Sequence, residues 1–158
     1  MHHFEVPAEA VYFFALFSRF EFALKRGGFC TGAPGEKAGP NWDTFANKLG
    51  EPFFNALQTR PETEVLFREP PRALKVGPDG EPFFEDQAAP QTAADLFVAA
   101  RRIRNNLFHG EKVYFLDRDR QLIAAATLVL ESALEQCNDG PLRRVGLAFA
   151  YAIWQQKP

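Results

Sequence analysis

The sequence predicts an all-α fold: a helical bundle of about four to five main helices, with a loop or a small hairpin inserted at about residues 60–90. Apolar side chains recur at three- and four-residue steps over several long segments, which is the period of amphipathic helices. These segments are bounded by capping residues or proline at the start and by glycine-containing turns at the end. Together, the period and the boundaries favour a helical bundle.

The chain has 158 residues and is expected to form a single domain over residues 1–158. A hydrophobic fraction of 46% argues against disorder. The formal net charge of -2 provides no overall attraction to nucleic acid, so any binding of that kind must come from a local basic patch.

Several classes of protein are not indicated. The start, Met1-His2-His3-Phe4, lacks the pattern of a signal peptide, and no apolar run has the length of a membrane span. Cys30 and Cys137 form no motif, so we expect reduced thiols in a cytoplasmic protein with no membrane partner. No group of residues has metal-ligand spacing, and neither a metal nor another cofactor is expected. The alternating charges of residues 117–120 indicate a solvated helix start.

The first long helix is predicted from Pro7 to about Arg26, with Gly27-Gly28 as its exit. Glu21 lies on the edge of its apolar stripe, where a carboxylate is costly to bury without a partner. It either bridges to Lys25 on the exposed surface or holds an arginine of the later cluster at residues 101–104.

The middle of the chain has shorter signals. Residues 27–40 are predicted as a loop; Asn41 caps a short helix that ends at Gly50, and Pro52 begins another apolar turn or two. Residues 60–90 are proline-rich and are predicted as a loop excursion. Within it, residues 74–76 and 82–84 flank a Gly-Pro-Asp-Gly turn and predict a small hairpin.

Two further long helices are predicted. Thr92 and Asp95 form a capping-box pattern before the first, and Gly110 follows its end. The next begins at Asp117 or Asp119 and reaches about Cys137. Residues 142–154 fit both a strand and a helix period, and their alanine content favours a helix.

The candidate chemistry lies at the end of the helix that Thr92 begins. His109 is the one histidine outside the N-terminus, and a histidine can move protons near neutral pH. Arg104 offers a bidentate fork for phosphate, and Asn105 and Asn106 add amide donors. These residue types suit RNA cleavage without a metal, by attack of the 2′-hydroxyl on the adjacent phosphate. They would equally suit a helix C-terminus, where cations favour the dipole and cap free carbonyls.

The segment Arg104-Asn105-Asn106-Leu107-Phe108-His109 resembles the signature of the HEPN superfamily (higher eukaryotes and prokaryotes nucleotide-binding). That signature is an arginine, four to six residues and a histidine, with a polar residue after the arginine. The first helix, around residues 17–25, is similar to the acidic helix of small plasmid- or defence-associated bacterial members.

The resemblance implies a HEPN-like bundle that pairs about a two-fold axis, with both motifs in a shared cleft. It implies a metal-independent endoribonuclease that leaves a 2′,3′-cyclic phosphate, acting as a toxin or defence component with a cognate antitoxin protein as partner. The implied catalytic residues are Arg104 and His109. Glu21 would contact Arg104 and hold it in position without touching the substrate. RNA or a nucleotide would be bound by further residues of the motif region: Arg101, Asn105, Asn106 and Lys112.

Two alternatives remain open from the sequence. In the first, the same cleft binds a nucleotide or RNA without turnover, since some HEPN members do not cut RNA. In the second, the chain is a protein-interaction bundle, and the motif serves only to cap its helix.

Overall fold

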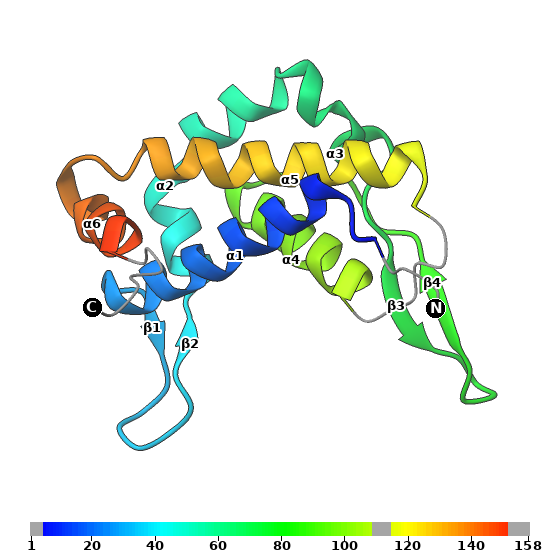
Figure 1. Ribbon diagram of the computed structural model, residues 1–158, viewed down its shortest axis with the longest axis horizontal. Coiled ribbons are helices and arrows are strands. Elements are labelled where there is room, and N and C mark those ends of the chain that lie inside the picture. The colour runs from blue at the N-terminus through cyan, green and yellow to red at the C-terminus, as the bar shows by residue number, and fades with distance from the viewer. Residues whose placement is uncertain (1–4, 109–114, 152–158) are drawn as a thin grey trace.

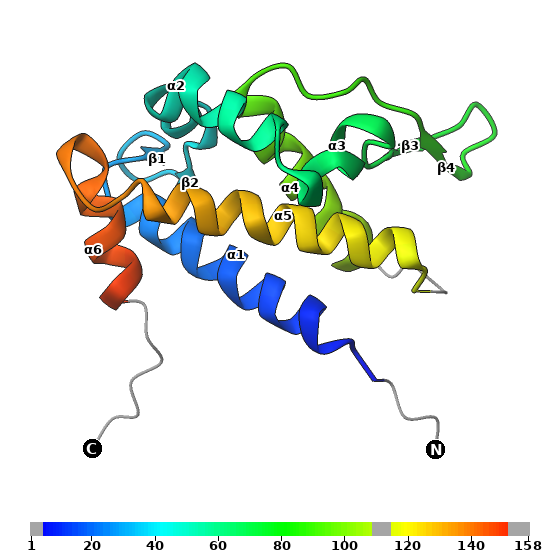
Figure 2. The ribbon, with the colours of Figure 1, turned by 90° about the horizontal axis from the view of Figure 1, so that it is seen from above.

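A computed structural model describes residues 5–108 and 115–151 of the chain. Within these two ranges it contains six α-helices, two short 3₁₀ helices and two two-stranded antiparallel sheets. The helix α5 runs along the molecule with α1 beside it, and the two small sheets project at opposite ends (Figure 1, Figure 2). The prediction of an all-α fold is confirmed in its coarser form: the described residues are mainly helical, with two small sheets. No helix in the described ranges is long and apolar enough to cross a membrane.

Helix α1 spans Ala8–Arg26, in agreement with the predicted bounds. Pro7 precedes it with φ of -54°, which suits a helix start. At the other end the N–H of Gly27 donates to the carbonyl of Ala23 at 2.7 Å. The buried face carries the residues that the apolar spacing predicts: Ala10, Phe13, Leu16, Phe17, Phe20, Ala23 and Leu24.

The segment after α1 is a narrow loop closed by a minimal sheet. Strands β1 (Cys30–Thr31) and β2 (Gly39–Pro40) pair across it, a detail that the prediction of a plain loop did not contain. Helix α2 follows over Trp42–Gln58, and the side chain of Asn41 accepts from the Thr44 N–H at 3.1 Å. Gly50 interrupts α2 with φ of 69° and ψ of -165°, so the two predicted short helices are the two arms of one kinked element.

Residues 61–68 are helical, and the prediction of an irregular excursion was wrong here. A 3₁₀ helix over Pro61–Thr63 leads into α3, Glu64–Arg68. Thr63, Val65 and Leu66 are buried, and this short segment packs against α5. A helix of one or two turns has little stability of its own, so packing against α5, rather than local periodicity, determines this structure.

The predicted hairpin is confirmed. Strands β3 (Ala73–Val76) and β4 (Pro82–Glu85) are antiparallel, with Lys75 opposite Phe83. Gly80 in the connecting turn has φ of 84°, a conformation that glycine adopts at low cost.

The remaining helices follow the predicted order. Helix α4 spans Ala93–Phe108, and its start has the predicted capping box: Asp95 N–H donates to Thr92 Oγ1 at 3.2 Å, and Thr92 N–H donates to Asp95 Oδ2 at 3.0 Å. Helix α5 spans Asp117–Glu135. After a 3₁₀ helix at Gly140–Leu142, α6 covers Arg143–Tyr151, which confirms the helical choice within the described residues.

The charged start of α5 is less solvated than predicted. Asp119 is 3% exposed, and its carboxylate accepts the N–H of Leu116 at 2.9 Å. Arg118 donates to the carbonyls of Glu69 and Pro70, both at 3.0 Å. These two side chains therefore bind backbone groups of the segments that lie next to the start of α5. The prediction of a freely solvated run was wrong for them.

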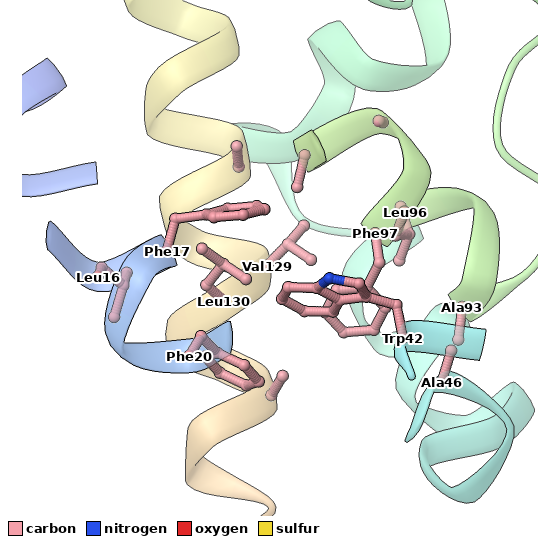
Figure 3. Close-up of a cluster of buried hydrophobic side chains, with 14 of the residues drawn as sticks. Leu16, Phe17, Phe20, Trp42, Ala46, Ala93, Leu96, Phe97, Val129 and Leu130 are labelled. Atoms are coloured by element: carbon pink, nitrogen blue, oxygen red, sulfur yellow. The ribbon is translucent and has the colours of Figure 1, made fainter. Parts of the chain in front are cut away.

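Stacked aromatic rings fill the centre of the bundle (Figure 3). Trp42 of α2 lies between Phe20 of α1 and Phe97 of α4, with ring centroids 5.5 and 5.3 Å apart. Phe53 stacks on Phe97, and Phe45 meets both Phe20 and Phe97. This cluster joins α1, α2 and α4 and explains part of the high phenylalanine content.

Candidate functional site

The last turns of α4 place the predicted motif at the edge of the bundle. Its buried face, which includes Leu96, Ala99, Ala100 and Ile103, packs into the core and fixes the rotation of the helix. The arginines at 101, 102 and 104 are therefore only partly exposed, and Asn105 points to the surface. His109 and Lys112 lie outside the described residues.

Arg104 is restrained by two contacts from α1. Its Nη2 lies 3.4 Å from Glu21 Oε1, and its guanidinium carbon lies 4.9 Å from the centre of the Phe17 ring. The Arg104 and Glu21 side chains are 34% and 28% exposed, so both are accessible. Of the two interpretations of Glu21, the structure has the one in which it pairs with an arginine of the 101–104 cluster.

The Nε of Arg104 is buried and has no hydrogen-bond partner among the described residues. A buried donor without a partner raises the free energy of the site unless water or a ligand accepts from it. The outer nitrogens of the guanidinium are the ones that a phosphate would approach.

Phe108 makes a second contact between α4 and α1. Its ring meets the ring of Phe14 edge to face at 5.8 Å, although 69% of the residue is exposed. Phe14, Phe17 and Glu21 recur at three- and four-residue steps, so one edge of α1 supplies all three contacts to the end of α4. Their spacing was the signal that could have identified Phe14 and Phe17 as neighbours of the motif.

Asn106 has an anchoring role that the sequence did not reveal. It is 9% exposed, and its Nδ2 donates to the carbonyl of Arg72 at 2.8 Å. This hydrogen bond ties the base of the β3–β4 hairpin to α4. The proposed contact of Asn106 with substrate remains a prediction.

A groove of about 630 Å³ lies between α4 and strand β3. Arg101, Arg102, Arg104 and Asn105 line it from α4, together with Asn106 and Val98, and Ala73 and Leu74 line it from β3. Arg101 Nε donates to the carbonyl of Phe97 at 3.4 Å, which leaves its outer nitrogens available. Sequence reasoning chose Arg101 but missed Arg102, because nothing local showed that the hairpin would form the opposite wall.

The charge of Arg102 is disfavoured where it stands. Partial burial lowers the pKa of Arg102 from its ordinary value, and the neighbouring charge of Arg101 lowers it further. Two adjacent arginines therefore line the groove, and burial disfavours the charge of one of them, Arg102.

The described residues offer no grouping of three or more His, Cys, Asp or Glu side chains that could hold a metal ion. The two cysteines are free thiols. Cys30 is exposed, whereas burial raises the pKa of Cys137 to about 12, so its thiol is inert at neutral pH.

Comparisons of the chain with protein-family models, with curated proteins and with solved structures give no significant match.

Proposed function

We propose that this chain is a metal-independent endoribonuclease of the HEPN type, which cleaves RNA with Arg104 and His109. The observation that carries the proposal is the position of Arg104 at the end of α4: two contacts from α1 hold it, and its side chain is one third exposed. A cation used only to cap the helix would not need an ion pair to another helix and an aromatic ring beneath it. His109 follows directly after α4 in the sequence.

In the proposed reaction the 2′-hydroxyl of a ribose attacks the neighbouring phosphorus and displaces the 5′-oxygen. His109 takes the hydroxyl proton or gives a proton to the leaving oxygen. Arg104 donates to the phosphate oxygens on which charge develops, the kind of stabilisation that is usually the largest in such reactions. The products are a 2′,3′-cyclic phosphate and a 5′-hydroxyl.

A homodimer would supply both an acid and a base. A single chain has one histidine at the motif, whereas the reaction needs one group to accept a proton and another to donate one. Pairing about a two-fold axis would bring two His109 and two Arg104 side chains into one cleft. Val11 and Phe108 are exposed and Phe14 is half-buried at this edge, which supports an apolar contact beside the motif.

The second candidate is a module that binds RNA or a nucleotide without turnover. The groove beside Arg101 and Arg102 favours it, because phosphate binding there needs no histidine. A toxin or defence role with a cognate antitoxin would be compatible with either candidate.

The test compares purified wild type with His109→Ala and Arg104→Gln on a mixed RNA in EDTA, with the product ends analysed for 2′,3′-cyclic phosphate. His3→Ala is the matched histidine control. We expect wild type and His3→Ala to cleave, and each motif variant to lose about a hundredfold or more in rate.

Thermal unfolding of each variant accompanies the assay. An inactive wild type that is folded and dimeric would overturn the ribonuclease and leave the binding module. If His109→Ala unfolds, Arg104→Gln still decides the question, because its partly exposed ion pair contributes little to stability.

A further inference from the structure

The groove between α4 and β3 is lined by two arginines, Arg101 and Arg102, to which the proposed cleavage step assigns no role. Most arginines and lysines near it have carboxylate partners: Arg104 pairs with Glu21, Arg72 with Asp86, and Lys75 with Glu85. Within the described part of the chain, Arg101 and Arg102 make no ion pair. Two uncompensated cations therefore line one side of the groove.

The opposite wall is held in place. The Asn106 amide binds the Arg72 carbonyl at 2.8 Å, and the Arg118 guanidinium binds the carbonyls of Glu69 and Pro70. These bonds fix the start of β3 against α4 and α5, so the groove is part of the folded structure. Leu74 lines it from β3 and is 36% exposed.

The fold disfavours the charge of Arg102. Partial burial and mutual repulsion both act against the charge of Arg102, as its lowered pKa indicates. A partly desolvated cation with no ion pair in the described part of the chain is typical of a binding site, where a ligand supplies the missing charge.

The chemistry of the lining selects a phosphate-bearing strand. Guanidinium groups bind phosphate through two parallel hydrogen bonds, and the exposed amide of Asn105 adds a neutral donor. A volume of about 630 Å³ is in the range that accommodates one small ligand, about the size of a short piece of a single strand. Because Arg104 lines the same groove, a strand lying there would lead directly to the proposed cleavage site.

We propose that this groove binds the phosphates of single-stranded RNA next to the phosphate that is cleaved, with Arg101 and Arg102 as the backbone contacts. This inference rests on the proposed ribonuclease and names its substrate as a single strand. The hairpin acts as a wall that confines the strand against α4.

The test measures binding of a fluorescein-labelled, fully 2′-O-methylated 12-nucleotide RNA by fluorescence anisotropy. This probe cannot be cleaved, so binding is scored whether or not the protein is a nuclease. The double variant Arg101→Gln/Arg102→Gln is compared with Arg143→Gln/Arg144→Gln. The control removes the same adjacent charges from the exposed start of α6.

We expect the α4 double variant to bind about tenfold or more weakly at 0.1 M salt and to lower the salt-dependence slope by about 1.4, roughly 0.7 for each lost phosphate contact. The α6 control should bind like wild type. The α4 variant should also be at least as thermostable as wild type, because it removes two repelling charges.

A second pair of variants tests the wall. Leu74→Glu places a carboxylate in the groove and should weaken binding, whereas Val76→Glu on the same strand, 76% exposed and outside the lining, should weaken it much less. Equal effects of the α4 and α6 double variants would overturn the groove, as would equal competition by an RNA duplex or by polyglutamate.

The two proposals fail separately. If the probe binds as expected but wild type cleaves no RNA, RNA binding in the groove is supported and the proposed ribonuclease activity is contradicted. If wild type cleaves RNA but the α4 double variant binds and cleaves like wild type, the ribonuclease activity is supported and RNA binding by Arg101 and Arg102 is contradicted.

Discussion

Arg104 shows how contacts worth little free energy can define a site. Its ion pair with Glu21 is 3.4 Å long and about one third exposed, and such pairs contribute roughly 0–1 kcal/mol to stability. The Phe17 ring beneath the guanidinium adds a similarly small amount. Together, however, the two contacts limit the directions in which the guanidinium can point, so their main effect is on orientation.

We therefore predict that Glu21→Gln impairs cleavage more than folding. The melting temperature should change little, while kcat falls roughly ten- to a hundredfold because Arg104 loses its fixed position. KM should stay the same or decrease, since the variant removes a negative charge from the neighbourhood of the substrate phosphate. Steady-state kinetics and thermal unfolding measure both effects.

Glu64→Gln is the matched control. It breaks an exposed pair with Arg68 of 3.2 Å on α3, away from the motif, and should leave both kinetics and stability unchanged. An unchanged kcat in Glu21→Gln, or a large fall in its melting temperature, would contradict a positioning role for Glu21.

At the scale of elements, helix α6 is held by an unusually close approach of backbones. A Cβ at Gly146 would lie 2.2 Å from the carbonyl oxygen of Cys137, just beyond α5. A Cβ at Gly27, at the end of α1, would lie 2.7 Å from the Cα of Val145. Glycine at these two positions lets α6 pack against the ends of both long helices.

We predict that Gly146→Ala destabilises the protein by about 1–3 kcal/mol. Within a helix, alanine is intrinsically better than glycine by about 1 kcal/mol, so a net loss would show that the contact with the Cys137 backbone dominates. Chemical denaturation measures the free energy of unfolding. Gly39→Ala is the control and should cost less, because its Cβ would meet one side-chain atom, Thr31 Oγ1 at 2.9 Å, and no backbone of another segment. A stabilised Gly146→Ala variant would contradict the close packing.

Sequence patterns predicted the helices whose ends are set by a few neighbouring residues, such as a capping box or a terminal glycine. Thr92 and Asp95 marked the start of α4, and Gly27 marked the end of α1, since caps and turns depend on a few neighbouring residues. The helical segment at 61–68 and the burial of Asp119 were missed because packing against distant parts of the chain decides them.

The candidate site was predictable to a similar degree. The motif identified Arg104 and its neighbours, but the sequence left two partners open for Glu21, which is 83 residues away in the chain. Arg102 is a candidate because the β3–β4 hairpin forms the other wall of the groove that Arg102 lines, and the sequence does not show this arrangement. Contacts between segments far apart in sequence are the part that residue spacing does not encode.

At the scale of the whole molecule, a slightly negative net charge goes together with a local group of arginines. The chain carries a net charge of -2, yet three arginines line one groove. Non-specific attraction to polynucleotides should therefore be weak, while binding in the groove can remain strong. A nuclease built this way would engage RNA through one short site.

Oligomeric state is the remaining property at this scale. Val11 is 52% exposed on the same edge of α1 as Phe14, which meets Phe108. We predict that wild type is a dimer by light scattering coupled to size exclusion, and that Val11→Asp is a monomer with little cleavage activity, because a charge in an apolar contact is costly to bury.

Val76→Asp is the control for the dimer, since Val76 is an equally apolar residue that is 76% exposed on the hairpin, away from α1. It should remain dimeric and active. A wild type that is monomeric and still cleaves RNA would contradict the two-fold cleft, and one chain would then have to supply both proton-transfer groups. A Val11→Asp variant that stays dimeric would place the interface on another face of the bundle.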